Sequence, residues 1–380
     1  MSDFFEIDFL DIESPKSGDA IPLRYQLNGI TYIHVVDGGF QACGEKIVKH
    51  IRTYYGNPKY IDHVVVTHPD QDHTGGLITV LEEFTVGELW MLRPWMYAEE
   101  LISRFAQFTS VGNLKRRLKE VYPRIAALEE IAMQKNIPIR EPFQGAAIGA
   151  FTVLAPSRTR YLDLIVESER TPESVEEAER STLESLGQLV QGIAVKAAAV
   201  VASVRAAWGE EIFSPEETSA ENEMSVIQYA YLCGNRLLLT GDAGRAALTE
   251  AADFAPYVGL PLPGINRFQV PHHGSRRNVS TEILDRWLGE RLPSQLLSGQ
   301  EKFSAIISSA KEDEAHPRKA VVRALYHRGA GVYATEGNSL CSSYNAPFRN
   351  WSPVQPLAYP HEQEEANAAK SAGVGNQLTR

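Results

Sequence analysis

The segment from Thr67 to Gly76 carries four side chains that could bind a metal ion, and they lie within six residues. In order, they are His68, Asp70, Asp72 and His73. The apolar, β-branched run at 61–67 leads into them and predicts a buried strand, while two glycines follow where the chain must turn. Carboxylates buried together repel one another unless a cation lies between them. The segment therefore predicts a metal-binding loop at the end of a strand.

Two further groups of candidate ligands follow predicted strands much later in the chain. Asp242 comes directly after one strand, where it could also cap the next helix, and His272 and His273 come after another. Open α/β folds bind ligands at the carboxyl ends of their strands, so distant strand ends can meet at one site. Since no histidine lies between His73 and His272, a third imidazole must come from this late pair or from His316.

The two late histidines are expected to have different roles. Adjacent residues at the end of an extended strand point in opposite directions, so one should bind metal while the other faces substrate or core. We favour His273 as the ligand and His272 as a proton donor. His316 precedes Pro317 at the start of a predicted helix, where it either supplies an acid on the substrate side or caps the helix.

Three residues that adjoin the late histidines could contact a substrate, namely Ser275, Arg276 and Arg277. Guanidinium groups at that point suit phosphate binding, although surface arginines are also common. Ser275 fits a turn or cap better than a nucleophile, because metal-activated water would already fill that role. The basic cluster Lys115–Lys119 fits either an exposed helix face or a contact with nucleic acid.

Strands and helices alternate around these motifs, which predicts a layered α/β fold. Strands are predicted at 5–12, 31–36, 61–67, 88–92, 151–154, 265–270, 304–308 and 331–334. Helices are predicted at 44–54, 76–84, 245–252 and 318–327. A hairpin is predicted over 225–240, with Gly234 and Asn235 as its turn.

Two helical insertions interrupt this alternation, at about 94–141 and 157–222. The second includes an Ala/Val-rich helix predicted at 182–208. We interpret residues 1–350 as a single domain that carries both insertions. The chain from 352 to 380 is Pro-rich and then polar, which predicts a disordered tail.

The composition is that of an ordinary globular protein of 380 residues, with a net charge of −11. This charge offers no broad attraction for nucleic acid or anionic membranes, so an anionic substrate needs a local positive site. The three cysteines are far apart, which indicates small buried side chains in a reducing compartment. The N-terminus has no signal-peptide core, and no apolar run is long enough to span a bilayer. We therefore expect a cytoplasmic protein without membrane association.

Together these motifs resemble the metallo-β-lactamase fold superfamily, through Thr67–Gly76, Thr240–Asp242 and the His-His-Gly-Ser sequence at 272–275. Within the superfamily the chain is most similar to the metallohydrolase domain of the ComEC/Rec2 DNA-uptake proteins and their free-standing relatives, which share the His-x-Asp-x-Asp-His spacing. Other segments that fit this subgroup are Gly18-Asp19-Ala20, Asn222–Val226 and Ala315-His316-Pro317. The competence proteins also have membrane-spanning channel segments that this chain lacks, so a role in DNA transport is not carried over.

The resemblance implies an αββα sandwich, with two mixed sheets inside and helices outside, and a site for two divalent metal ions. Asp242 would bridge the ions. Asp72, His73 and one late histidine would hold one ion, while His68 and Asp70 would join Asp242 around the other. The chain lacks the mid-chain histidine that completes this second ion's ligands elsewhere in the superfamily. Because the remaining set is rich in oxygen, Mn²⁺ suits it as well as Zn²⁺, and one ion could arrive with the substrate.

The resemblance also implies the reaction. We expect a metal-dependent phosphodiesterase or nuclease that acts on nucleic acid or a nucleotide through a hydroxide bridging the metals. Asp72, His272 and His316 are the predicted catalytic residues, with a late-chain histidine protonating the leaving oxygen. Asp37 resembles a turn residue near the metals of the superfamily, and it would support a metal ligand rather than bind an ion itself.

Two other functions stay open. The same fold and metals serve hydrolysis of a carboxylic ester, thioester, lactone or lactam, and fold does not decide substrate. Alternatively, the protein is a metal-bearing subunit of a multi-protein system and docks through its helical insertions. The apolar face at 193–204 could then pack on a partner helix, or else on the protein's own sheet.

Overall fold

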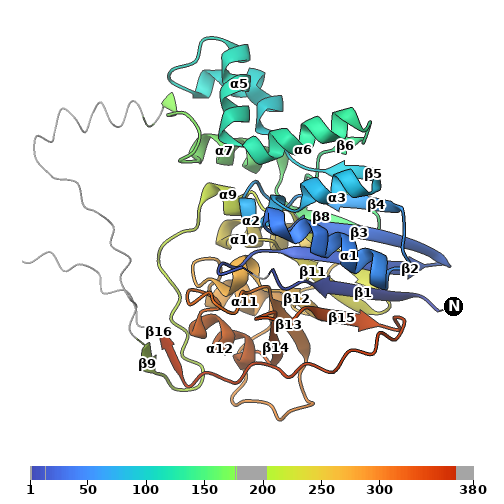
Figure 1. Ribbon diagram of the computed structural model, residues 1–380. Helices are drawn as coiled ribbons and strands as arrows, with labels where there is room; N and C mark the ends of the chain where they lie inside the picture. The colour runs from blue at the N-terminus through green and yellow to red at the C-terminus, as the bar shows by residue number, and fades with distance from the viewer. Residues whose placement is uncertain (1, 13, 176, 178–202, 365–380) are drawn as a thin grey trace, which may run out of the picture.

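Two seven-stranded mixed sheets form the centre of the computed structural model, which describes residues 2–12, 14–175, 177 and 203–364 (Figure 1). In spatial order, the first sheet contains β15 (Leu340–Tyr344), β1 (Phe4–Phe9), β2 (Ala20–Leu27), β3 (Ile30–Gly38), β4 (Tyr60–Val65), β5 (Thr85–Trp90) and β6 (Ile139–Arg140). The second contains β14 (Ala330–Ala334), β13 (Phe303–Ile307), β12 (Arg267–Gln269), β11 (Asn235–Leu239), β10 (Ile227–Leu232), β8 (Phe151–Ala155) and β7 (Ala147–Ile148).

The pairing of the strands brings the candidate ligands to one edge of the sandwich. Strands β3, β4 and β5 run parallel in the first sheet, and β11, β12, β13 and β14 run parallel in the second. The loops that carry the predicted ligands follow β4, β11 and β12. Because these loops leave the carboxyl ends of their strands, they meet at the same edge of the two sheets.

Helices cover the outer face of each sheet, so the chain forms four layers. The helices that cover the first sheet are α1 (Gly44–Tyr54), α3 (Leu77–Glu83) and α6 (Pro123–Gln134). Those that cover the second are α10 (Arg245–Phe254), α11 (Thr281–Leu288) and α12 (Lys319–His327). Apolar side chains form one core between the sheets and one under each helical layer, as an αββα sandwich requires. This arrangement agrees with the α/β fold class predicted from the sequence.

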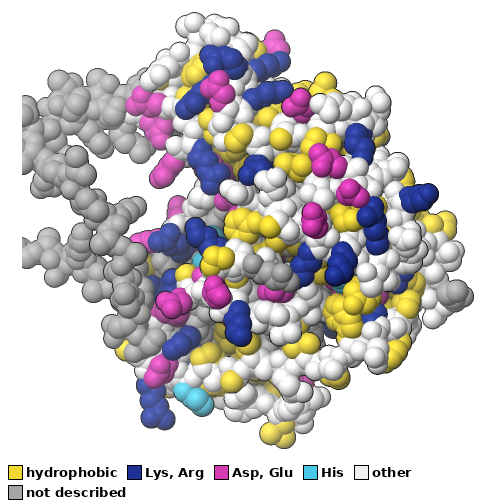
Figure 2. All heavy atoms as spheres, in the orientation of Figure 1, with side chains coloured by type: hydrophobic (Ala, Val, Ile, Leu, Met, Phe, Trp, Pro, Cys, Tyr) yellow, Lys and Arg dark blue, Asp and Glu magenta, His cyan; other side chains and the backbone are white. Residues whose placement is uncertain are grey.

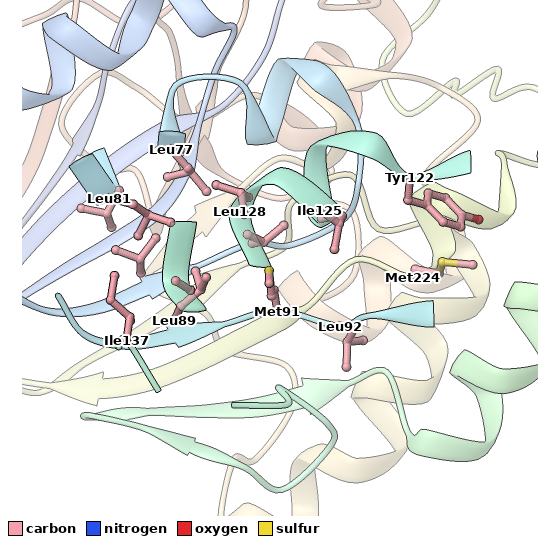
Figure 3. Close-up of a cluster of buried hydrophobic side chains, with 14 of the residues drawn as sticks. Leu77, Leu81, Leu89, Met91, Leu92, Tyr122, Ile125, Leu128, Ile137 and Met224 are labelled. Atoms are coloured by element: carbon pink, nitrogen blue, oxygen red, sulfur yellow. The ribbon is translucent and has the colours of Figure 1, made fainter. Parts of the chain in front are cut away.

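The core under α3 and α6 shows how amphipathic segments create these layers (Figure 3). Leu77 and Leu81 are four residues apart on α3 and project from the same face, as helical periodicity requires. They meet Leu128 of α6 and Leu89 of β5, and all four side chains are fully buried. Burial of these leucines fixes the position of β5, the strand that follows the candidate metal loop.

The region predicted as the first insertion is helical, and it gathers with α7 at one end of the molecule (Figure 1). Its elements are η2 (Pro94–Tyr97), α4 (Ala98–Leu101), η3 (Ile102–Arg104), α5 (Val111–Val121) and α6, which lead to β6. The described parts of the second predicted insertion are α7 (Arg158–Glu167), β9 (Ser203–Arg205) and α9 (Ala220–Glu223). Most of the helix predicted at 182–208, and nearly all of the apolar face at 193–204, lies outside the described residues.

Two predictions for the later part of the chain are wrong. Residues 203–205, predicted to be helical, form β9, because they pair with β16 (Glu362–Glu364). Residues 352–364, assigned to a disordered tail, are instead held in place. Both carboxylate oxygens of Glu364 accept backbone hydrogen bonds from the first turn of α12, at 2.9 and 3.0 Å, so this segment caps a helix whose N–H groups would otherwise lack partners.

Two hairpins also differ from the sequence prediction. Strand β2 was not anticipated, although it joins β3 through Asn28 and Gly29, whose φ angles of 51° and 81° suit a tight hairpin turn. In the later hairpin the turn residues are Cys233 and Gly234, one position earlier than predicted, because Leu232 pairs with Asn235.

The face of the molecule in Figure 2 carries Lys and Arg side chains interspersed with Asp and Glu. A broad basic surface is therefore not present on this face. Among the described residues, the helices are all too short or too polar to cross a bilayer.

Candidate metal centre

Asp37 anchors the loop that carries the first four candidate ligands. It lies near the end of β3 with a left-handed φ of 57°, a conformation that Asp adopts more readily than most residues. Its Oδ1 accepts a hydrogen bond from the Thr67 backbone N–H at 2.9 Å, and its Oδ2 accepts one from Thr67 Oγ1 at 2.6 Å. Oδ2 also lies 2.7 Å from Nδ1 of His73. Because a carboxylate only accepts, Nδ1 carries a proton and Nε2 of His73 is directed into the site.

Close contacts between backbone segments shape the same loop. The single-turn helix α2 (Gln71–Thr74) holds Asp72 and His73, and the Asp72 carbonyl accepts a hydrogen bond from the Asp19 N–H at 3.1 Å. Gly76 lies so close to the end of β3 that a Cβ atom there would be 2.2 Å from the carbonyl oxygen of Gly38. A side chain cannot fit at that distance, which explains why glycine follows the ligand motif.

The late histidines lie in a strained turn, and both face the site. The 3₁₀ segment η5 (Pro271–Gly274) follows β12, and His272 and His273 have φ angles of 47° and 54°. Two successive non-glycine residues in the left-handed region are uncommon, and such strain clusters at functional sites. The expectation that the two rings point in opposite directions is therefore wrong: it assumed extended backbone, whereas the left-handed turn directs both Nε2 atoms toward Asp242.

Asp242 lies at the centre of the cluster, with its two oxygens facing different imidazoles. Its Oδ1 is 3.2 Å from Nε2 of His73 and 3.8 Å from Nε2 of His273. Its Oδ2 is 3.8 Å from Nε2 of His68 and 3.6 Å from Nε2 of His272. The following helix α10 begins at Arg245 with Gly244 at its N-cap, so Asp242 does not cap it.

The remaining carboxylates divide between the two sides of Asp242. Oδ2 of Asp72 lies 3.6 Å from Nε2 of His273, and Oδ2 of Asp70 lies 3.8 Å from Nε2 of His68. We call the residues on the Oδ1 side the first donor set: Asp72, His73, His273 and Asp19. Those on the Oδ2 side form the second donor set: His68, Asp70 and His272. The resemblance to the superfamily implied a similar division, with His273 favoured over His272 as the late ligand and without Asp19.

Asp19 is a site residue to which sequence reasoning assigned no role. It is buried, and its Oδ2 accepts a hydrogen bond from Gln269 Nε2 at 2.9 Å and lies 3.8 Å from Nδ1 of His73. With Asp242 and His273 it forms a group whose ligand atoms lie within 4.8 Å of one another. The signal in the sequence is Gly18-Asp19 before a strand: a Cβ atom on Gly18 would lie 2.6 Å from the Asp72 carbonyl oxygen, so the chain must pass close to the metal loop.

The unpaired polar atoms of the cluster fit divalent ions. Five buried atoms that face its centre form no hydrogen bond: Nε2 of His68, His73 and His273, Oδ1 of Asp242 and Oδ1 of Asp19. Buried polar groups are nearly always paired, so these unpaired atoms on both sides of Asp242 fit bound cations as their partners. A histidine whose Nδ1 is hydrogen-bonded to a carboxylate or a backbone carbonyl is a typical metal ligand through Nε2. Nδ1 of His73 contacts Asp37 in this way, and Nδ1 of His273 lies 2.8 Å from the Ser308 carbonyl oxygen.

The pKa values show that positive charge is needed among these carboxylates. Burial alone would raise the pKa of Asp242, but the neighbouring imidazoles outweigh burial and hold it well below its ordinary value. Burial alone would lower the pKa of His273, but the carboxylates of Asp242 and Asp72 raise it to about 9. Burial raises the pKa of Asp19 to about 6. Protonated imidazoles balance the carboxylates here, and a divalent cation would take over that function.

His316 lies beside the late histidines but does not cap a helix. Its ring stacks on that of His272 with centroids 5.5 Å apart, and its Nδ1 is 3.2 Å from Oδ2 of Asp313. Helix α12 starts at Lys319 with Arg318 at its N-cap. Burial and the nearby imidazoles lower the pKa of His316 to about 4, so its ring is neutral near pH 7. A neutral ring does not favour the acid role predicted from the sequence.

The residues predicted to bind substrate directly follow the η5 segment that holds the late histidines. Arg276 is buried, at 6% exposure, and Arg277 forms an ion pair with Glu216 at the surface. Ser275 is a turn residue, as the sequence indicated: its N–H bonds the His272 carbonyl at 2.9 Å, and its Oγ accepts from the Arg277 N–H at 3.3 Å.

Residues 35–136 match the family model described as "Metallo-beta-lactamase superfamily", a stretch that includes Asp37 and the whole loop from His68 to His73. Curated protein sequences give no match.

Solved structures also resemble the chain, at low similarity. "Rm3 metallo-beta-lactamase" shares 14% identity over 42% of this chain and 49% of that chain, with a TM-score of 0.23. "Hydrolase AbOPH in beta lactamase superfamily" shares 10% identity over 65% of this chain and 74% of that chain, with a TM-score of 0.31. CmlA, "a diiron beta-hydroxylase from Streptomyces venezuelae", shares 12% identity over 90% of this chain and 54% of that chain, with a TM-score of 0.37. The matched part of this chain thus spans about half the length of the Rm3 protein.

The matching family model, the two mixed sheets between helical layers and the His/Asp cluster at their common edge agree with one another. Residues 35–136 thus match the metallo-β-lactamase superfamily, and the chain has candidate metal-binding groups.

Proposed function

We propose that this protein is a hydrolase of phosphodiesters that depends on two divalent metal ions. One observation carries the proposal: the two carboxylate oxygens of Asp242 face two separate pairs of imidazole nitrogens, at 3.2 to 3.8 Å. A carboxylate in this position can bridge two ions. The first donor set would hold one ion and the second donor set the other, and the mixture of carboxylate and imidazole ligands suits Mn²⁺ or Zn²⁺.

When bound, a pair of divalent ions lowers the pKa of water and stabilises charge on a phosphoryl group. The protein's own residues determine how that chemistry is arranged. Asp37 orients His73, the Ser308 carbonyl orients His273, and both interactions keep Nε2 directed at Asp242. Asp72 lies at the solvent-accessible side of the first donor set, with 28% of its side chain exposed, next to where a substrate would bind.

His272 has two possible roles: it could donate a proton to the leaving group, or it could bind a metal ion. Its Nδ1 lies 2.9 Å from Nδ2 of Asn222 and 3.1 Å from Oδ1 of Asn278. If Asn222 donates to Nδ1, Nε2 carries a proton that a leaving oxygen could take. If Nδ1 donates to Asn278, Nε2 is free to bind an ion. The side-chain contacts are compatible with either role.

Three features support a phosphodiester over a carboxylic ester or lactam. Carboxylates make up half of the candidate ligands, and they suit hard ions, which prefer phosphate oxygens as ligands. Two ions can stabilise both the attacking and the leaving oxygen of a phosphoryl group. The His-x-Asp-x-Asp-His spacing resembles the DNA-uptake subgroup, a relationship that stays a prediction from the sequence. The net charge of −11 and the mixed charges in Figure 2 favour a nucleotide or short strand over long duplex DNA.

The basic cluster on α5 adds no support for binding long nucleic acid. Arg116 pairs with Glu120 at 2.6 Å, and Lys119 pairs with Glu129 at 2.6 Å. These charges are neutralised by neighbouring carboxylates, as on an ordinary exposed helix face.

The test uses metal-depleted protein reloaded with Mn²⁺ or Zn²⁺. Substrates are bis-p-nitrophenyl phosphate, single-stranded DNA, RNA and a lactone. We expect metal-dependent cleavage of a phosphodiester that is abolished in Asp72→Ala and retained in Asp163→Ala, a control carboxylate paired with Arg104 on the insertion surface. Cleavage of the lactone alone, lost in Asp72→Ala, would replace the proposal with carboxylic-ester or lactam hydrolysis.

A further inference from the structure

The donor sets are open to solvent at three residues. His68, His73, Asp242 and His273 are almost fully buried, whereas Asp70 and His272 of the second donor set expose 23% and 28% of their side chains, and Asp72 of the first exposes 28%. Two of these three residues belong to the second donor set, so a substrate can approach along its edge. A side chain on this edge can contact that substrate.

Arg170 lies on this edge, on a segment that sequence reasoning assigned to an insertion. Its Nη1 is 2.6 Å from Oδ1 of Asp70, while Oδ2 of Asp70 faces His68. The side chain of Arg170 remains 44% exposed. A guanidinium has five N–H donors in a planar fork, so one contact with Asp70 leaves donors for a second anion.

Buried contacts hold the turn that carries Arg170. Helix α7 ends at Glu167, and Ser168 Oγ then accepts a hydrogen bond from the Arg170 N–H at 3.1 Å. The Ser168 hydroxyl donates to the buried carboxylate of Glu221, which also accepts from the Tyr122 hydroxyl at 3.1 Å. Nε of Arg170 lies 3.7 Å from the same carboxylate. The guanidinium is thus positioned before any substrate arrives.

The charges of the site explain why a positively charged side chain is needed beside it. Asp19, Asp70, Asp72 and Asp242 contribute four negative charges to the donor sets, which two divalent ions would only neutralise. An anionic substrate gains no net attraction from such a centre, nor from a chain of net charge −11. Arg277, which the sequence suggested for this role, is paired with Glu216 instead.

We propose that Arg170 is a substrate-binding residue that contacts the phosphate group of the substrate through the part of its guanidinium not used by Asp70. This inference rests on the proposed function of the metal centre. It assigns the second insertion a direct part in selecting anionic over neutral substrates.

The test compares Arg170→Met and Arg170→Lys with the wild-type protein, all loaded with Mn²⁺. The matched control is Arg160→Met, which removes an arginine from α7 that pairs with Glu167. Three quantities are measured: bound metal per chain, the dissociation constant of inorganic phosphate by calorimetry, and kcat and KM for bis-p-nitrophenyl phosphate.

We expect Arg170→Met to keep two metal ions while its phosphate dissociation constant and its KM rise about 10- to 100-fold, the effect of losing one charge-assisted contact. Arg170→Lys should have values of both constants between those of wild type and Arg170→Met, because lysine keeps the positive charge but lacks the planar fork of N–H donors. Arg160→Met should match wild type.

Two results would overturn this inference. If Arg170→Met binds both ions and its affinity for phosphate is unchanged, Arg170 does not contact the phosphate. Loss of a metal ion from both Arg170 variants would show that Arg170 only positions Asp70. The proposed function fails differently: wild-type protein would then bind phosphate through Arg170 without cleaving the diester.

Discussion

Replacing Asp37 with Asn should weaken metal binding through the orientation of a single proton. The carboxylate accepts three hydrogen bonds: 2.9 Å from the Thr67 N–H, 2.6 Å from Thr67 Oγ1 and 2.7 Å from Nδ1 of His73. An amide has only one accepting oxygen. If that oxygen keeps the bond to the Thr67 N–H, the NH₂ group takes the other position and donates to Nδ1. His73 then switches tautomer, and its Nε2 carries a proton toward Asp242.

The size of this effect follows from the role of Asp37 as a support for a ligand. Removing such a support typically weakens metal binding 10- to 100-fold, or about 1.4 to 2.7 kcal/mol. The backbone adds little to this cost, because Asn tolerates the φ of 57° at this position. Titration calorimetry of metal-depleted protein with Mn²⁺ and with Zn²⁺ measures the change.

The matched control for this prediction is Asp62→Asn. Asp62 also accepts a backbone hydrogen bond, from the Ile33 N–H at 2.7 Å, but it lies on β4 and has no contact with a candidate ligand. Its amide variant should bind both ions as wild type does. Equal affinities in wild type and Asp37→Asn, or an equal loss in both variants, would refute the reasoning that Asp37 sets the tautomer of His73.

Three further changes test the centre and the fold. Asp242→Ala should lower the bound metal from two ions to none, since both donor sets share this residue; elemental analysis that still finds two ions would contradict the bridging role. Glu211→Gln should destabilise the protein by about 2 kcal/mol at pH 7 in urea unfolding, because it removes one of the two carboxylate partners of the buried Arg328, the other being Asp285. Burial alone would raise the pKa of Glu211, but hydrogen bonds from His327 and Arg328 lower it from 4.5 to about 2. The stabilisation by ionised Glu211 is present above pH 4.5 and is lost toward pH 2. The unfolding free energies of wild type and Glu211→Gln should therefore converge between pH 4.5 and 2, and a difference that stays constant over this range would contradict the prediction. Leu128→Ala should cost about 3 kcal/mol, the effect of a cavity at a fully buried site, without changing the metal content.

Much of the fold could be predicted from local pattern. Helix α1 begins and ends where the sequence predicted, because Ile47, Val48 and Ile51 follow helical periodicity and bury one face. The αββα arrangement came from the resemblance to a known superfamily rather than from periodicity. β2 was missed because alternation in that stretch is weak, with both faces of the strand largely buried.

The sequence by itself predicted the candidate metal loop, because two imidazoles and two carboxylates within six residues are typical of metal ligands. It also identified Asp242 and the late histidines as distant contributors. It could not decide where those histidines point. That depends on a left-handed turn, and local sequence offers no periodicity for such a conformation.

Only the tertiary structure brought Asp19 and Arg170 to the centre and directed His272 at Asp242. Each depends on contacts between segments far apart in the chain: the start of β2 against the metal loop, the end of β12 against Asp242, and a turn after α7 against Asp70. Ligand types are a property of residue chemistry and can be recognised one motif at a time. Their division into two donor sets is a property of distances, which exist only once the sheets have packed and their carboxyl ends have met.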